Sequence, residues 1–547
     1  MTHQWDERTQ RALSRTYGGL TSGYEYDAGG RISGLQTGDF SPLSLSYDAA
    51  GREHLRQSRA GFIQAQGYTP TGMLQVQAAG RDSVQFRHLL GGDGSEMTGS
   101  VVNRRWAYDG AYNVRRIEDG LWGNTQFSCD QNDQITRVMP GGAGSAEERF
   151  EYDADLNIRA VLAAEQHISQ QQQAGRVVSR GDCEYRYDAA GRLTEKRLCR
   201  DGWRPQRWRY RWNAHSQLSE FITPGGERWR YAYDPFGRRI RKEKLSDIAA
   251  GTRPVGCEYQ WSGDQLIAET PLYADGRAAY EESIHWLYAP GALTPVARQE
   301  KGKLHYVVSD HMGTPRELLT EQGKRAWAGR LSLWGKGSQW AVAANDAEKL
   351  SCNLRFAGQY ADEESGLHYN RFRYYDTETG QYLTPDPIGL AGGVNPYGYV
   401  HNPLGWVDPL GLNVLALPAP TSSDPWGSGA SLESALTPKG GITVEMAMSP
   451  GQTSPGGWAT VDYIPDVNYV RNQLAVIPGF KPEISHVQEF HIPEGIRIQT
   501  GPVGLQIYGG VRYPGGGSQI QILNYADRAK LSPVGEPRKI YYNKCGC

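Results

Sequence analysis

The stretch GYEYDAGGRISGL at residues 23–35 recurs along the first half of the chain with the same layout. Further copies are LSYDAAGREHL at 45–55, YRYDAAGRLTEK at 185–196 and YAYDPFGRRIRK at 231–242. In each copy an aromatic residue alternates with another residue, an Asp follows, and a Gly comes before a second run. Alternation with period two puts the aromatic side chains on one face of a strand, and Asp and Gly suit a tight turn. The unit is therefore predicted to be a β-hairpin.

The turn recurs at a regular interval, because several neighbouring copies are 21–25 residues apart. A single hairpin cannot bury its own aromatic face, so successive hairpins are expected to stack into one continuing sheet. A mainly β fold class follows from this pattern. The acid or amide that opens each turn lies at Asp27, Asp48, Asp109, Asp130, Asp153, Asp188, Asn213 and Asp234.

Composition agrees with strands and turns, since the 547 residues include 67 Gly and 32 Tyr and the hydrophobic share is only 39%. The formal net charge of −2 excludes a global surface for polyanions. No run of about 18 apolar residues occurs, so no membrane span is expected. The seven cysteines are odd in number and scattered, which predicts synthesis in a reducing compartment.

The repeats resemble the tyrosine-aspartate (YD) repeats of the Rhs family of polymorphic toxins. Three later stretches carry the same resemblance: HYVVSDHMGTPRELLTEQGKRAW at 305–327, LRFAGQYADEESGLHYNRFRYYDTETGQYLTPDPIGL at 354–390, and NPYGYVHNPLGWVDPLGL at 395–412. The resemblance implies a YD-repeat β-shell over residues 1–300 and an Rhs core-associated plug over 301–412. A carbohydrate-binding β-solenoid or propeller is the alternative fold.

The segment PLGWVDPLGL at 403–412 fits the pattern P-x-x-x-x-D-P-x-G-L, which resembles the terminator of the Rhs core. In Rhs proteins and the related C components of Tc toxins this terminator marks a self-cleavage site just after its last leucine. The resemblance therefore implies a cut between Leu412 and Asn413.

Asp386 and Asp408, in two matching Asp-Pro units, are the expected catalytic pair for this cut. Two carboxyls held close together share a proton and can act as acid and base. Arg373 matches an arginine associated with cleavage in the Tc relatives, and it is expected to orient a carboxylate or steady an oxyanion. The alternative is that both Asp residues only begin turns. The neighbouring acids of YADEESG, Asp362, Glu363 and Glu364, are expected to form a solvated turn.

The chain changes character after residue 412. Residues 413–440 are rich in Pro, Ser, Gly and Ala and are expected to be a linker, followed by a compact α+β domain over 441–547. In Rhs proteins a variable toxin follows the terminator, so residues 413–547 are expected to be that toxin. This region holds ten Lys and Arg against ten Asp and Glu, which argues against a nonspecific nuclease. Its histidines have no metal-ligand spacing, and no metal is expected.

The order of short strands and one helix in this region resembles the split β-sandwich of ADP-ribosyltransferases. GGWAT at 456–460 resembles the segment that lines the nicotinamide pocket, with Trp458 stacking and Thr460 hydrogen bonding. The stretch YPGGGSQIQI at 513–522 takes the place of the closing turn and its Q/E-x-E strand, but it ends in Gln-x-Gln. It also resembles a group of NAD-consuming necrotizing toxins, in which the glutamine matched by Gln519 is functional.

The resemblance implies NAD as a substrate and gives Gln519 a catalytic role. The residues expected to contact NAD are Trp458, Thr460, Arg471, Arg497, His486, His491 and Gly516. Each of them has a structural alternative: the triple glycine can be only a hairpin loop, and a histidine or arginine on a strand is often structural.

Taken together, these features predict a self-cleaving Rhs shell that encloses an antibacterial toxin. The toxin is expected to be an ADP-ribosyltransferase that modifies a protein or RNA in the cytoplasm of the target cell. One alternative is an NAD glycohydrolase that depletes NAD, and another is a non-enzymatic surface protein for adhesion or sugar binding. Synthesis in the bacterial cytoplasm and type VI-like secretion are expected. The expected partners are an immunity protein that masks the toxin cleft, and a secretion spike and chaperone bound through an N-terminal region absent from this sequence.

Overall fold

The computed structural model describes the chain in two units, Met1–Glu25 with Ser33–Ala419, and Tyr26–Ile32 with Pro420–Cys547. The two units are described separately. The described residues are all except 7–10, 83–99, 142–145, 164–165, 246–252, 343–349, 394, 413–414, 417–432, 477–480, 482, 504–505, 509–510, 514–515, 523–524 and 543–547.

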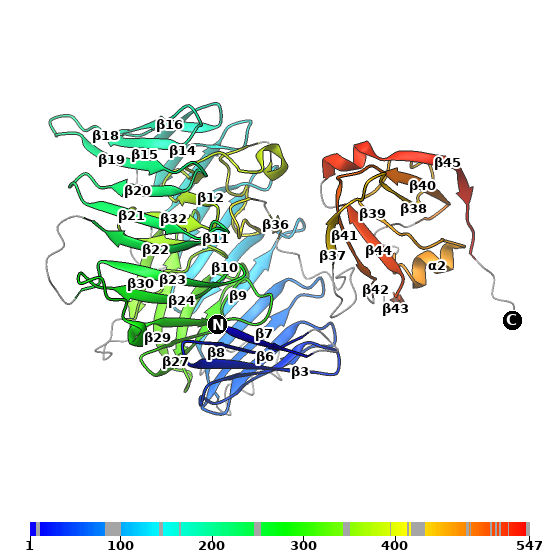
Figure 1. Cartoon of the computed structure of the whole chain (residues 1–547), viewed down its shortest axis with the longest axis horizontal. Helices are drawn as coiled ribbons and strands as arrows, with labels where there is room; N and C mark the ends of the chain where they lie inside the picture. The colour runs from blue at the N-terminus through cyan, green and yellow to red at the C-terminus, as the bar shows by residue number, and fades with distance from the viewer. Residues whose placement is uncertain are drawn as a thin grey trace. The chain divides into compact units, whose positions relative to one another are not determined.

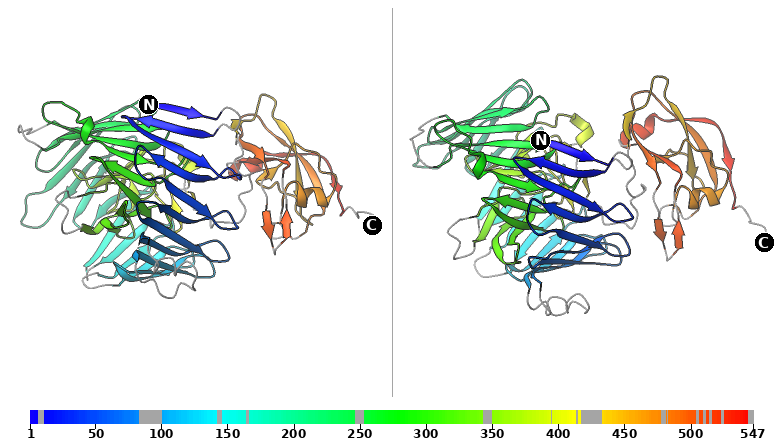
Figure 2. Two further views of the ribbon diagram at one scale, coloured as in Figure 1. Left: turned by 90° about the horizontal axis from the view of Figure 1, so that it is seen from below. Right: turned by 60° about the horizontal axis from the view of Figure 1, so that its bottom comes forward.

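A 30-stranded sheet, here called the wall, makes up most of the first unit. Its strands pair with their neighbours along the chain, as the antiparallel pairs β17–β18 and β21–β22 illustrate, and they stack one above another into a curved surface (Figures 1 and 2). The first strands are β1 Thr2–Trp5, β2 Ala12–Tyr17, β3 Leu20–Tyr26, β4 Ile32–Thr37, β5 Leu43–Tyr47, β6 Glu53–Ser58, β7 Phe62–Tyr68, β8 Leu74–Arg81, β9 Ser100–Tyr108, β10 Val114–Asp119, β11 Gly123–Cys129, β12 Ile135–Pro140, β13 Glu148–Tyr152, β14 Ile158–Ala163 and β15 Gln166–Gln173.

The wall continues past residue 300, so its end differs from the predicted shell boundary. Its remaining strands are β16 Arg176–Arg180, β17 Cys183–Tyr187, β18 Leu193–Leu198, β19 Gln206–Trp212, β20 Leu218–Ile222, β21 Arg228–Tyr233, β22 Arg239–Lys244, β23 Gly256–Ser262, β24 Gln265–Leu272, β25 Ile284–Leu287, β26 Ala297–Glu300, β27 Lys303–Ser309, β28 Pro315–Thr320, β29 Arg325–Leu331 and β30 Gly337–Val342, with the short helix η1 Tyr280–Glu282. The prediction of a mainly β fold built from hairpins is confirmed.

The acid of each repeat closes its turn. In the β17–β18 hairpin the Asp188 carboxylate accepts the backbone N–H of Ala190 at 3.0 Å and of Arg192 at 3.0 Å, and the Arg192 Nε at 2.8 Å. Gly191 takes a positive φ of 77° in the same turn. Burial opposes ionisation, but the Arg192 amide and guanidinium still hold the pKa of Asp188 below its ordinary value. The turn is thus fixed by the residues that the repeat pattern singled out.

In the repeats that begin at Tyr185 and Tyr231, the two tyrosines lie on the same face of the strand and make different contacts. The first is buried in the core, as Tyr185 and Tyr231 are. The second donates its hydroxyl to a backbone carbonyl earlier in the wall: Tyr187 to Val177 at 2.9 Å, and Tyr233 to Leu218 at 2.9 Å. This bond ties each hairpin to the one before it.

Residues 350–412, here called the inner segment, pack against the aromatic face of the wall. One core cluster joins Tyr185, Tyr210 and Tyr231 of the wall to Tyr369 and Tyr374 of the inner segment. The segment contains a four-stranded sheet, β31 Tyr360–Asp362, β32 Leu367–Asn370, β33 Arg373–Asp376 and β34 Gln381–Tyr382, then η2 Gly389–Gly392 and β35 Trp406–Val407. Strand β35 pairs with β36 Leu415–Ala416, which follows the segment.

The inner segment also binds the turns of the wall through polar side chains. Tyr397 donates its hydroxyl to the Gly191 carbonyl at 2.8 Å, and Asn402 donates its amide to the Asp133 carbonyl at 2.9 Å. Arg371 donates to the Phe236 carbonyl at 3.0 Å. Each of these carbonyls belongs to a different repeat, so the three hydrogen bonds together fix the position of the inner segment along the wall.

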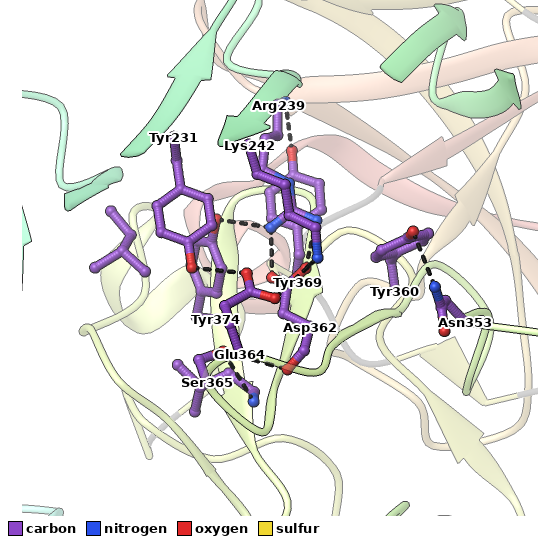
Figure 3. A network of polar contacts seen from close by, with 12 residues as sticks. Tyr231, Arg239, Lys242, Asn353, Tyr360, Asp362, Glu364, Ser365, Tyr369 and Tyr374 are labelled. Carbon is purple, nitrogen blue, oxygen red and sulfur yellow. Dashed lines mark hydrogen bonds and ion pairs between the residues drawn. The ribbon is translucent and has the colours of Figure 1, made fainter. Parts of the chain in front are cut away.

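The acids of YADEESG are not a solvated turn, and that prediction is wrong for two of the three. The Asp362 side chain is fully buried and forms ion pairs with Arg239 and with Lys242, the latter at 3.0 Å (Figure 3). Glu364 accepts a bond from Lys242 at 3.0 Å and from the Tyr231 hydroxyl at 2.9 Å. Glu363 alone is exposed.

This cluster is held together by charge and by aromatic rings. The guanidinium carbon of Arg239 lies 4.4 Å from the centre of the Tyr369 ring and 4.8 Å from that of Tyr259. Burial acts to raise the pKa of Asp362, but Arg239 and Lys242 outweigh it and hold that pKa below its ordinary value. The cluster therefore joins β22 of the wall to β31 of the inner segment.

The second unit contains two small sheets. The first has the strand order β37 Glu433–Leu436, β41 Arg497–Pro502, β44 Ser518–Ile522 and β39 Trp458–Ala459, and the second joins β38 Ile442–Met448, β40 His486–Ile492 and β45 Ser532–Lys539. The hairpin β42 Gln506–Tyr508 with β43 Val511–Tyr513, helix α2 Val467–Asn472 and helix η3 Tyr525–Lys530 complete it. The region expected to be a linker, 413–440, thus holds strands β36 and β37, which differs from the prediction.

Replacing Asp362 by Asn should lower the free energy of unfolding of the first unit by about 3–5 kcal/mol, because it leaves the Arg239 charge buried without a carboxylate. Urea unfolding followed by tryptophan fluorescence measures this. Glu363→Gln, at the exposed neighbouring acid, is the matched control and should change little. Since the pKa of Asp362 is lowered by folding, its stabilisation is present above about pH 4 and is lost as the pH falls further. Equal stability of the two variants at pH 7 would contradict the role of the cluster.

Candidate functional site

The inner segment brings together the three residues that were expected to carry out the self-cleavage, Arg373, Asp386 and Asp408. Arg373 begins β33, Asp386 follows β34, and Asp408 follows β35. The Arg373 Nη2 lies 2.9 Å from Asp386 Oδ2 and 3.3 Å from Asp408 Oδ2. Their side chains are at most 3% exposed. One buried guanidinium therefore bridges two buried carboxyls.

Both carboxyls also cap the turns in which they lie. Asp386 Oδ1 accepts the backbone N–H of Ile388 at 3.0 Å, and Asp408 Oδ1 accepts that of Leu412 at 2.9 Å. Both Asp residues therefore do form turns, as the structural alternative expected. Turn formation uses only the Oδ1 atoms, whereas Oδ2 of each residue contacts Arg373.

The backbone of Leu412 is held from two sides. Asp408 binds its N–H, and the Arg373 Nε donates to the preceding carbonyl, that of Gly411, at 2.6 Å. A side-chain carbon on Gly392 would collide with both the Asp386 Oδ2 and the Leu412 carbonyl oxygen. The Asp386 carboxyl and the Leu412 carbonyl thus face the same small space, which the glycine leaves free. Asn413, the expected residue after the cut, lies outside the described residues.

The electrostatics of the pair favour a shared proton. Burial raises the pKa of Asp386 above its ordinary value, against the opposing effect of Arg373, and the Asp408 charge adds to the rise. Burial likewise raises the pKa of Asp408, opposed by Arg373 and by the hydrogen bonds from Leu412 and Tyr382. Two such carboxyls in contact with one cation can hold one proton between them and act as acid and base.

Three further residues complete this site, and the sequence analysis did not find them. Tyr382 donates its hydroxyl to Asp408 Oδ2 at 2.9 Å, and its ring lies 3.7 Å below the Arg373 guanidinium carbon. Asn370 donates to the Tyr382 hydroxyl and to the Asp408 carbonyl. Gly392 is the third. In the sequence Tyr382 and Asn370 look like ordinary strand residues, and no local pattern distinguishes them.

In the second unit, part of the predicted NAD site lies together. Strands β39 and β44 pair, so that Trp458 is opposite Gln521, and the Thr460 hydroxyl lies 3.1 Å from that of Ser518. Gln519 follows Ser518 and is buried, whereas Trp458 is 39% exposed. Asp462, which the sequence analysis did not mark, accepts the Ser518 N–H at 2.8 Å.

The other predicted NAD contacts are placed elsewhere or have structural partners. Arg471 is buried in α2 and donates to the carbonyls of Val476 at 2.6 Å and Lys481 at 2.8 Å, which favours its structural alternative. His486, whose Nδ1 bonds the Ser485 hydroxyl, and His491 both lie on β40 in the other sheet. Arg497 is exposed at the start of β41, and Gly516, with φ 103°, donates its N–H to the Val503 carbonyl.

The described residues contain no group of three or more His, Cys, Asp or Glu placed to hold a metal ion. Within the same part of the chain, no helix is both long and apolar enough to cross a membrane.

Comparison with known proteins agrees with the fold of the first unit. Residues 113–251 match the teneurin YD-shell family and residues 304–339 match the RHS protein family. The Tc holotoxin pore of Photorhabdus luminescens covers 76% of this chain, and this chain covers 21% of it, at a TM-score of 0.57 and 17% identity. At that identity the likeness shows the fold alone.

Two curated relatives are similar over most of this chain. The probable deoxyribonuclease RhsA of Dickeya dadantii (strain 3937) is 39% identical over 403 residues, which is 72% of this chain and 26% of that protein. The double-stranded DNA deaminase toxin A of Burkholderia cenocepacia (strain H111) is 32% identical over 404 residues, 70% of this chain and 27% of that protein. The chain thus spans about a quarter of the length of these relatives. The wall carries the segments that match the teneurin YD-shell and RHS protein families.

Proposed function

We propose that the chain cleaves its own backbone between Leu412 and Asn413, with Asp386 and Asp408 as acid and base. The observation that carries this proposal is the Arg373 guanidinium, which bridges both buried carboxyls beside the Leu412 backbone. Two buried carboxyls that contact one cation beside the Leu412 backbone are placed as acid–base catalysis requires.

The positions of the two carboxyls suggest which does what. Asp386 faces the Leu412 carbonyl oxygen across the space left by Gly392, so in its protonated form it can donate to that oxygen. Asp408 accepts bonds from Arg373, Tyr382 and the Leu412 N–H, which favour its ionised form. It takes a proton from water while the water oxygen bonds to the Leu412 carbonyl carbon.

Collapse of the tetrahedral intermediate completes the reaction. The bond from the Leu412 carbon to the Asn413 nitrogen breaks, that nitrogen receives the proton held by Asp408, and the proton on the intermediate's oxygen returns to Asp386. The products are a carboxyl group on Leu412 and an amino group on Asn413, and both catalytic residues regain their starting states. Arg373 holds the carboxyls in place and offsets the negative charge that develops.

Purified protein should therefore consist of two fragments that meet at the junction of Leu412 and Asn413, as intact mass determines. Asp386→Asn and Asp408→Asn should each leave the chain uncut, because either loses one half of the acid–base pair. Asp376→Asn is the matched control: Asp376 is a buried acid on β33 whose described side-chain hydrogen bond comes from the Glu378 N–H, and this variant should be cut. Cleavage that persists in both site variants would refute the proposal.

Gly392→Ala should slow cleavage by about 100-fold while the protein stays folded, because the added methyl group separates Asp386 from the Leu412 carbonyl. The φ of Gly392 does not lie in the left-handed region, so alanine suits the backbone there. Gly110→Ala is the control, because Gly110 is exposed, lies outside the left-handed region and has no atom within 4 Å of an added methyl group; this variant should be cut at the normal rate. Unchanged cleavage by Gly392→Ala would show that this space is not used.

We further propose that the released C-terminal region is a toxin that uses NAD, as an ADP-ribosyltransferase acting on a macromolecule of the target cell. Support comes from Thr460, Ser518 and Asp462, which are hydrogen bonded together beside Trp458 and Gln519. These polar groups lie next to the exposed ring of Trp458, which can stack on nicotinamide. The glycohydrolase alternative uses the same residues. An immunity protein that masks this surface, and delivery into competing bacteria, belong to the same proposal.

A nucleic-acid-acting toxin is the rival, because the relatives named above are a deoxyribonuclease and a DNA deaminase. The ten basic and ten acidic residues of 413–547 give it little electrostatic support. The purified protein, incubated with adenylate-labelled NAD and bacterial extract, should transfer label to a discrete protein or RNA, and Gln519→Ala should lose most of that transfer. NAD consumed without transfer would favour the glycohydrolase. Intact NAD with degraded or deaminated DNA would refute the NAD proposal.

A further inference from the structure

Tyr382 sits between two hydrogen bonds that give its hydroxyl a direction. The hydroxyl oxygen accepts from Asn370 Nδ2 at 2.6 Å and donates to Asp408 Oδ2 at 2.9 Å. The same Asn370 nitrogen donates to the Asp408 backbone carbonyl at 2.8 Å. A carbonyl oxygen can only accept, so the Asn370 amide must present its nitrogen here. The Tyr382 proton is thereby left to point at the carboxylate.

This arrangement is rigid. Asn370 is fully buried and Tyr382 is 2% exposed, and they lie on β32 and β34 of the same small sheet. The Arg373 guanidinium covers the Tyr382 ring. Two residues on regular strands therefore hold a catalytic carboxyl that itself lies in a turn.

The two catalytic carboxyls differ in what surrounds them. Asp408 accepts a hydrogen bond from Tyr382 in addition to its turn amide and Arg373, whereas the side-chain partners described for Asp386 are its turn amide and Arg373 alone. The titratable groups that face Asp408 are Arg373, Asp386, Tyr382 and Tyr399. Of these groups, Tyr382 donates its hydroxyl to Asp408 Oδ2. No hydroxyl donor to the Asp386 side chain is described.

We propose that Asn370 and Tyr382 form a positioning relay that keeps Asp408 ionised and correctly oriented, and so assigns it the role of base and Asp386 that of acid. The inference rests on the self-cleavage proposed above. Neither relay residue touches the scissile bond. Asn370 fixes the direction of the Tyr382 hydroxyl, and Tyr382 holds the Asp408 oxygen.

Tyr382→Phe removes only the hydroxyl and keeps the ring under Arg373. The full chain, pulse-labelled by cell-free translation and chased in buffers from about pH 5 to pH 8, gives the cleavage rate at each pH. Loss of one hydrogen bond to a charged group should slow cleavage about 10- to 100-fold. It should also raise the pKa of Asp408, so that the acid limb of the pH–rate profile moves to higher pH. Asn370→Ala should do the same to a smaller degree, and the double variant should be less impaired than the two single effects predict, because Asn370 acts through Tyr382.

Tyr375→Phe is the matched control. Its ring lies 5.9 Å from that of Tyr382, and its buried hydroxyl donates to the Trp334 carbonyl. It should cleave at the wild-type rate with an unshifted profile. If Tyr382→Phe behaves like Tyr375→Phe, or slows cleavage without moving the acid limb, the relay is refuted while self-cleavage stands. If the unaltered chain is not cut, or Asp408→Asn is cut, the proposed self-cleavage itself fails.

Discussion

A two-stranded hairpin cannot bury its own aromatic face, and the architecture of the first unit depends on this constraint. Each hairpin resolves it by pairing with the next, while the second tyrosine of the repeat donates to the backbone of an earlier hairpin. The remaining aromatic face is covered by the inner segment. Because side chains at that contact are buried, a charge between wall and segment needs a partner, as Arg239 has in Asp362.

Burial also supports the chemistry proposed for Asp386 and Asp408. In water two carboxyls beside an arginine would simply ionise. Here burial raises the pKa of both Asp386 and Asp408, and Arg373 keeps them close despite their mutual repulsion. The inner segment is fixed to successive turns of the wall by Tyr397, Asn402 and other side chains. The fold thus positions the Leu412 backbone against the groups that are proposed to cut it.

Local sequence patterns predicted the parts of the structure that local physics decides. The Asp and Gly of each repeat, such as Asp188 and Gly191, fix a turn over five residues, and the paired Asp-Pro units marked Asp386 and Asp408. Asp362 was wrongly expected to face solvent, because a run of acids is usually exposed and its partner Arg239 lies 123 residues earlier. Tyr382 and Gly392 could not be found for the same reason, because their roles depend on the Asp408 carboxyl and the Leu412 carbonyl, which come from later in the chain. In the second unit, Arg471 was expected to bind the NAD phosphates, because the sequence alone does not show that its guanidinium bonds the Val476 and Lys481 carbonyls.

If Asp386 and Asp408 activate water against the Leu412 carbonyl, the new carboxyl oxygen of Leu412 must come from solvent. The chain is translated in a cell-free system made up in water enriched in ¹⁸O, and the fragment ending at Leu412 is examined by mass spectrometry. We expect one solvent oxygen in the terminal carboxyl group of Leu412 and an unmodified amino group on Asn413. A fragment that ends at Leu412 without solvent oxygen, or a cut at any other bond, would contradict this mechanism.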